Sequence, residues 1–101
     1  MNNATVLYQN SETYLKELLK NQLPTASKFF LFGSRANGSA GFASDIDIGI
    51  LPQKPLDDTI IAKLQEIIEE SFIPYNVDLV DFSKVSEQFK QQALKKIIPW
   101  N

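Results

Sequence analysis

Two aspartates separated by one residue, Asp45 and Asp47, are the side chains of this sequence best suited to chemistry. They lie in residues 45–51, where carboxylates alternate with isoleucines ahead of a proline, as in a strand with one polar and one apolar face. Both carboxylates therefore point to the same side, where like charges repel unless a cation lies between them. Mg²⁺ bound through oxygen is a cation that suits such a pair. The alternative is a solvated strand face, and the pair alone does not decide between them.

Asp78 stands in a second segment of strand character, Val77-Asp78-Leu79-Val80, where a lone carboxylate would be costly to desolvate. If the two strands are neighbours, Asp78 joins Asp45 and Asp47 in a three-carboxylate cluster. Such a cluster can hold two Mg²⁺ ions about 3.5 to 4 Å apart, as in phosphoryl and nucleotidyl transfer. The alternative is that Asp78 simply reaches solvent. Asp81 points to the opposite side of this strand, and we expect it to form a turn or cap.

A Gly-Ser pair, Gly33-Ser34, directly follows a short apolar segment and begins what reads as a helical turn. Backbone N–H groups and a hydroxyl at such a turn can receive the oxygens of a triphosphate. Arg35 is the only arginine of the chain and comes next, so its guanidinium is a candidate for the same phosphates. Gly33, Ser34 and Arg35 are therefore the predicted nucleotide-binding residues, with an ordinary glycine turn and a surface arginine as the alternatives.

The composition limits the chemistry that remains. The 101 residues include no cysteine and no histidine, which excludes disulfides, thiolate metal sites, cysteine nucleophiles and a Ser-His-Asp triad. Ten basic against twelve acidic residues give a formal net charge of −2, the wrong sign for a protein that binds nucleic acid through its phosphates. No N-terminal export signal and no long apolar run are present, so we expect a cytoplasmic protein that does not enter a membrane.

Hydrophobic periodicity predicts the elements that position these residues within one domain, 1–101. We expect strands at 28–32, 45–51 and 75–82, and helices at 11–23, at about 56–72 and after Ser86, which should cap the last helix. This order predicts an α/β (α+β) fold, a small mixed sheet flanked by helices, with the helix at 56–72 as a crossover between two strands. We expect the last helix to turn its apolar residues inward: Phe89, Ala93, Leu94, Ile97 and Ile98. The alternative for Ile97 and Ile98, together with Trp100, is a partner interface.

Three segments together resemble the minimal nucleotidyltransferases of the DNA polymerase β superfamily: Gly33-Ser34-Arg35-Ala36-Asn37-Gly38, Ser44-Asp45-Ile46-Asp47 and Val77-Asp78-Leu79-Val80-Asp81. The resemblance covers nearly the whole chain. It implies a palm-like nucleotidyltransferase fold and transfer of a nucleoside monophosphate, usually from ATP with Mg²⁺, onto a hydroxyl acceptor. Asn37 departs from the pattern, because many members of the family carry a basic residue there.

The resemblance also implies a role for each matching residue. Asp45 and Asp47 would ligate both metal ions, and Asp78 would complete the metal site and help to activate the acceptor hydroxyl. Gly33 and Ser34 would hold the β- and γ-phosphates of ATP.

The resemblance further implies a partner. Stand-alone members of the family are similar to antitoxins that place AMP on a tyrosine of a small helical ribonuclease toxin of the HEPN class. The resemblance therefore implies a HEPN-type protein as the partner. Separately, 101 residues leave an acceptor pocket that is shallow or shared with another chain, which is compatible with a homo- or hetero-oligomer. Two alternatives stay open: a binding module that neutralises its partner by covering it, and nucleotidyl transfer to a small molecule such as an aminoglycoside.

Overall fold

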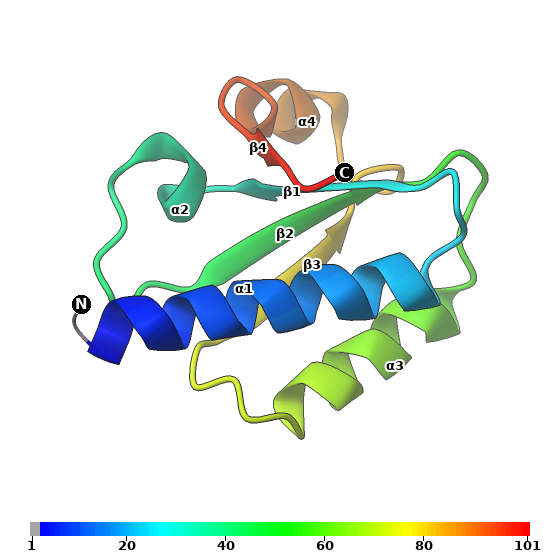
Figure 1. The fold of residues 1–101 in the computed structure, drawn as a ribbon. Helices are drawn as coiled ribbons and strands as arrows, with labels where there is room; N and C mark the ends of the chain where they lie inside the picture. The colour runs from blue at the N-terminus through cyan, green and yellow to red at the C-terminus, as the bar shows by residue number, and fades with distance from the viewer. Residues whose placement is uncertain (1–2) are drawn as a thin grey trace.

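The computed structural model describes residues 3–101 as four helices and a four-stranded sheet (Figure 1). The helices are α1 (Asn3–Gln22), α2 (Ser34–Asn37), α3 (Asp58–Glu69) and α4 (Glu87–Ala93). The strands are β1 (Lys28–Phe32), β2 (Ile46–Leu51), β3 (Val77–Asp81) and β4 (Ile98–Pro99), in the sheet order β3-β2-β1-β4. Since β1 pairs antiparallel with β2 and β4, while β2 pairs parallel with β3, the sheet is mixed. The predicted fold class is confirmed.

Helix α3 makes the crossover that joins the parallel strands β2 and β3. Its start is set by Asp57, whose side chain accepts a hydrogen bond from the backbone N–H of Thr59 at 2.9 Å. Leu64 and Ile68 bury the inner stripe of the helix. The helix is shorter than predicted: it ends at Glu69, and Phe72, which lies beyond its end, is 55% exposed.

The two faces of the sheet have different covers (Figure 1). Helices α1 and α3 pack on the face that carries the alternate residues Ile46, Ile48 and Ile50 of β2, all fully buried. Helix α4 lies over the other face, where aromatic rings including Phe30 and Phe82 form a second cluster. Gly49 leaves the space for these rings, since a Cβ there would lie 2.8 Å from a ring carbon of Phe82. The period-2 alternation of β2 thus separates a core face from a face on which polar groups can be placed.

The C-terminal segment differs from the prediction. Helix α4 begins after Ser86, whose side chain accepts from the N–H of Phe89, but it ends at Ala93 and a short strand follows. Phe89 is 42% exposed, but its ring packs against those of Phe32 and Phe82, as an inward orientation predicts. Ile98 is 43% exposed, so its predicted inward orientation was wrong. The reason is that Ile98 pairs with β1 at the sheet edge, where Pro99, which lacks an N–H, is tolerated.

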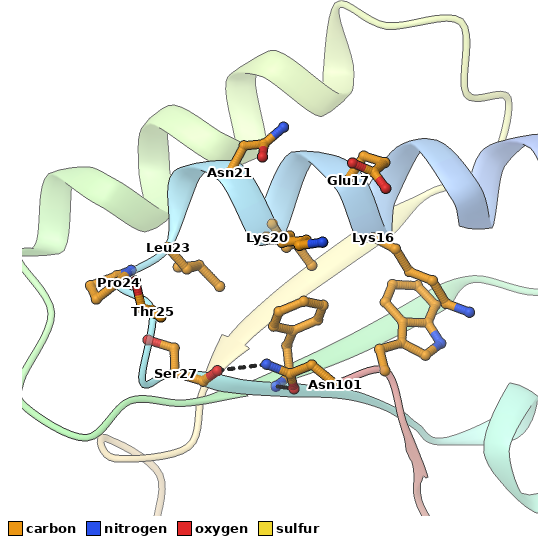
Figure 2. A pocket seen from close by; sticks show the side chains of 12 residues that line it. Lys16, Glu17, Lys20, Asn21, Leu23, Pro24, Thr25, Ser27 and Asn101 are labelled. Carbon is orange, nitrogen blue, oxygen red and sulfur yellow. Dashed lines mark hydrogen bonds between the residues drawn. The ribbon is translucent and has the colours of Figure 1, made fainter.

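The remaining apolar residues of this segment are half-buried. Ala93, Leu94 and Ile97 pack against the second aromatic cluster, and Trp100 packs against the main core. Asn101 holds the end of the segment: its side chain accepts from the N–H of Phe29 at 2.9 Å and donates to the carbonyl of Ser27 at 2.7 Å (Figure 2). A helical stripe could not predict this arrangement, because it depends on pairing with a strand about seventy residues away.

Candidate active site

The sheet register brings two of the three predicted carboxylates side by side. Asp47 of β2 is paired in register with Asp78 of β3, so the two side chains emerge on the same face at adjacent strands. Asp45 lies two residues before Asp47, just ahead of β2. The condition stated for a three-carboxylate cluster, that the two acidic strands are neighbours, is met.

Electrostatics link all three carboxylates. The pKa of Asp47 is raised above its usual value, first by partial burial and then by the negative charges of Asp78 and Asp45. Asp45 and Asp78 themselves are exposed. A bound cation would offset the repulsion among these negative charges. Carboxylate oxygens are the donors that Mg²⁺ prefers.

The side chains are nevertheless not closed around a metal position. Among residues 3–101, no group of three His, Cys, Asp or Glu side chains is gathered as a metal site. Carboxylate oxygens fit Mg²⁺, but they are not gathered around one point. The predicted metal ligation by Asp45, Asp47 and Asp78 therefore stays a prediction.

Gly33 lies directly against Asp47. It follows the last residue of β1, Phe32, which pairs in register with Asp47. Gly33 has a φ of +72°, and a Cβ built on it would run into the Asp47 carboxylate, with the Asp47 Cγ at 3.3 Å. Only glycine combines that backbone conformation with that close approach. Its carbonyl accepts from the N–H groups of Ala36 and Asn37, each at 3.0 Å, and so begins α2. The predicted Gly33-Ser34 turn therefore adjoins the carboxylates.

Arg35 makes contacts that the sequence did not suggest. Its Nε and Nη2 donate to the carbonyl of Ser44 at 3.1 and 2.7 Å, and Nη2 also donates to the carbonyl of Phe42 at 3.2 Å. The guanidinium lies 4.3 Å from the ring centre of Tyr8 and 5.0 Å from that of Tyr75. Arg35 thereby ties the loop that leads into Asp45 to the start of α1. Its predicted contact with nucleotide stays a prediction.

Tyr8 and Tyr75 are the residues around this arginine that sequence reasoning missed. Their rings meet edge to face at 5.8 Å between centres. Burial and the neighbouring Glu12 raise the pKa of Tyr8 to about 12, so its hydroxyl is neutral beside the stacked guanidinium. No local pattern marks either residue, because they come from α1 and from the segment before β3.

We expect Arg35→Lys to lower the free energy of unfolding by about 1 to 2 kcal/mol, because a lysine cannot reproduce the forked contact with Ser44 and Phe42. Chemical denaturation measures the loss, and limited proteolysis reports on the loop at 39–44. Lys20→Arg is the control, since it exchanges the same two residue types at an exposed position of α1. An Arg35→Lys protein as stable and as resistant as wild type would contradict the tethering role.

Asp81 has the turn role predicted for it. Its Oδ1 accepts from the N–H and the hydroxyl of Ser83, at 2.9 and 2.6 Å. This carboxylate pairs in register with Ile50 of the core face and is separated from Asp78 by the sheet.

Comparison with known proteins decides the family. Residues 13–99 match the family described as polymerase beta, nucleotidyltransferase. The chain belongs to this family. The matched range of the nucleotidyltransferase domain contains all six predicted site residues, from Gly33 to Asp78.

This nucleotidyltransferase is similar to a named protein and to chains of solved structures. The chain is 34% identical over 83 residues to the probable protein adenylyltransferase MntA of Haemophilus influenzae, covering 82% of this chain and 73% of that protein. A chain in the structure of the tri-AMPylated HEPN toxin of Shewanella oneidensis in complex with MNT antitoxin matches with a TM-score of 0.71 and 28% identity, over 92% of this chain and 71% of that one. A toxin-antitoxin structure with AMP-PNP matches with a TM-score of 0.74 and 29% identity, over 91% and 73%.

Proposed function

We propose that this nucleotidyltransferase moves AMP from ATP onto a hydroxyl group of a HEPN-type helical toxin and thereby acts as its antitoxin. The observation that carries the proposal is the register of Asp47 with Asp78, with Gly33 against the same carboxylate. The relatives support it: one is named a probable protein adenylyltransferase, another matched structure pairs an AMPylated HEPN toxin with an MNT antitoxin, and a third carries AMP-PNP.

The predicted carboxylates and the Gly33-Ser34 turn have separate roles in this proposal. Asp45, Asp47 and Asp78 would hold Mg²⁺, and Asp78 would also face the acceptor. Gly33 and Ser34 would receive the β- and γ-phosphates. Bound Mg²⁺ would neutralise the charge that develops on the phosphate oxygens. The remaining contribution is to orient the acceptor oxygen in line with the α-phosphorus, which needs no histidine or cysteine.

The bond changes are those of nucleotidyl transfer. The acceptor oxygen forms a bond to the α-phosphorus, and the bond from this phosphorus to the oxygen bridging to the β-phosphorus breaks. Pyrophosphate leaves with that electron pair. The hydroxyl proton would pass to a carboxylate, for which we propose Asp78, because its side chain is exposed.

Among residues 3–101, no helix has the length and apolar character needed to cross a bilayer. A location in the cytoplasm is part of the proposal, since the expected toxin partner is a ribonuclease.

The test incubates the protein with Mg²⁺, a purified HEPN-type partner and ATP labelled at either the α- or the γ-phosphate. Label on the partner from α-labelled ATP alone, with a mass gain of one AMP on a hydroxyl side chain, is the expected result. Asp78→Asn should reduce the labelling. Label from γ-labelled ATP would indicate a kinase instead.

Two other outcomes would overturn the proposal. A complex that silences the toxin without any label would make the protein a covering antitoxin. Modification of a small hydroxyl compound in the absence of partner would make the small molecule the substrate.

A further inference from the structure

A pocket beside Gly33 has no role in the transfer reaction proposed above. It has a volume of about 400 Å³ and lies between the end of β1 and the end of α4. The aromatic rings of Phe32 and Phe89 line one part of it, and Lys95 and Lys96 line another. Figure 1 shows that the turn from α4 to β4, which carries both lysines, lies on the same side of the sheet as α4.

The two lysines are uncompensated positive charges. Both are exposed, and neither forms an ion pair within residues 3–101, whereas Lys16 and Lys84 do. Both lysines line the same pocket, so their charges add, and a concave surface with partly apolar walls focuses their field on an anion inside it. This pocket therefore favours a ligand with several negative charges close together.

The order of the strands places this pocket at a defined end of the site. Crossing the sheet from β3 to β4, one meets Asp78, then Asp47, then Gly33 at the end of β1, and finally the turn before β4. An in-line displacement has the same order: acceptor oxygen, α-phosphorus, and then the β- and γ-phosphates as the leaving group. With the acceptor at Asp78, the leaving group points to the lysines.

We propose that Lys95 and Lys96 form a subsite for the β- and γ-phosphates of the nucleoside triphosphate and, after transfer, for pyrophosphate. This inference rests on the proposed function. The lysines are binding residues, since the strand order places them at the leaving-group end, away from the α-phosphorus. They add charge-assisted hydrogen bonds to those of the Gly33-Ser34 turn.

Binding of pyrophosphate, tripolyphosphate and AMP, each with Mg²⁺, tests the subsite by calorimetry. Lys95→Gln/Lys96→Gln should weaken pyrophosphate and tripolyphosphate about tenfold and AMP less than about twofold, with a shallower dependence on salt. The control is Lys54→Gln/Lys63→Gln, which removes the same charge from exposed positions after β2 and on α3. Circular dichroism verifies that each protein is folded.

The outcomes are distinct. Unchanged pyrophosphate affinity in the Lys95/Lys96 variant, an equal loss in the control, or an equal loss for AMP would overturn the subsite. In an active preparation, the Michaelis constant for ATP and the inhibition constant for pyrophosphate should rise together by about tenfold. A loss confined to kcat would contradict it. If the wild type transfers no AMP at all, the proposed function fails, while pyrophosphate binding still decides this inference.

Discussion

Asp47→Asn is expected to reduce AMP transfer by on the order of 10³-fold while the protein stays folded. Asp47 lies between the other two carboxylates and against Gly33, so its charge acts at the centre of the proposed reaction. Asparagine keeps the shape and removes the charge. Transfer of label from α-labelled ATP measures the effect, and Glu66→Gln, an exposed position on α3, is the matched control. An Asp47→Asn enzyme with wild-type activity would end the metal-site proposal.

The same variant should melt about 1 to 3 °C higher than wild type at neutral pH without Mg²⁺. The raised pKa of Asp47 means that the folded state binds this proton more tightly than the unfolded chain does. Stability therefore falls as the pH rises from the unfolded pKa through the folded one, and the charged carboxylate is a cost above it. Asparagine removes that cost, so the gain should disappear at acid pH, where Asp47 is protonated in both states. A variant less stable than wild type at pH 7 would contradict the repulsion.

Gly33→Ala is expected to reduce transfer by on the order of 10²-fold and to lower the free energy of unfolding by about 1 to 3 kcal/mol. Two causes act together: alanine is strained at a φ of +72°, and its methyl group would collide with the Asp47 carboxylate. Kinetics with ATP and chemical denaturation measure the two effects separately.

Gly38→Ala separates the causes. Gly38 has a φ of +85°, but no atom lies within 4 Å of a Cβ built there. This control should lose about 1 kcal/mol of stability and keep most of its activity. If both alanine variants lost activity equally, the close approach of Gly33 to Asp47 would have no role in transfer.

Local patterns in the sequence predicted most of the elements and the residues of the candidate site. The alternation in residues 45–51 predicted a strand with Asp47 on its polar face, and the serine at 86 predicted the start of the last helix. These predictions succeeded because strand alternation and helix capping depend on neighbours within a few residues. The motif from Gly33 to Asp78 also indicated the nucleotidyltransferase family, which the match over residues 13–99 confirmed.

Only the tertiary structure decided which groups meet. The register of Asp47 with Asp78, the contact of Gly33 with Asp47, and the tether from Arg35 to the loop before Asp45 all join separate elements. The pairing of Ile98 with β1 overturned a helical prediction for the same reason. A periodic pattern specifies the face on which a side chain lies, but not which residues of other elements contact it. Those contacts depend on strand order and register, which are set by long-range pairing and by the packing of the shared core.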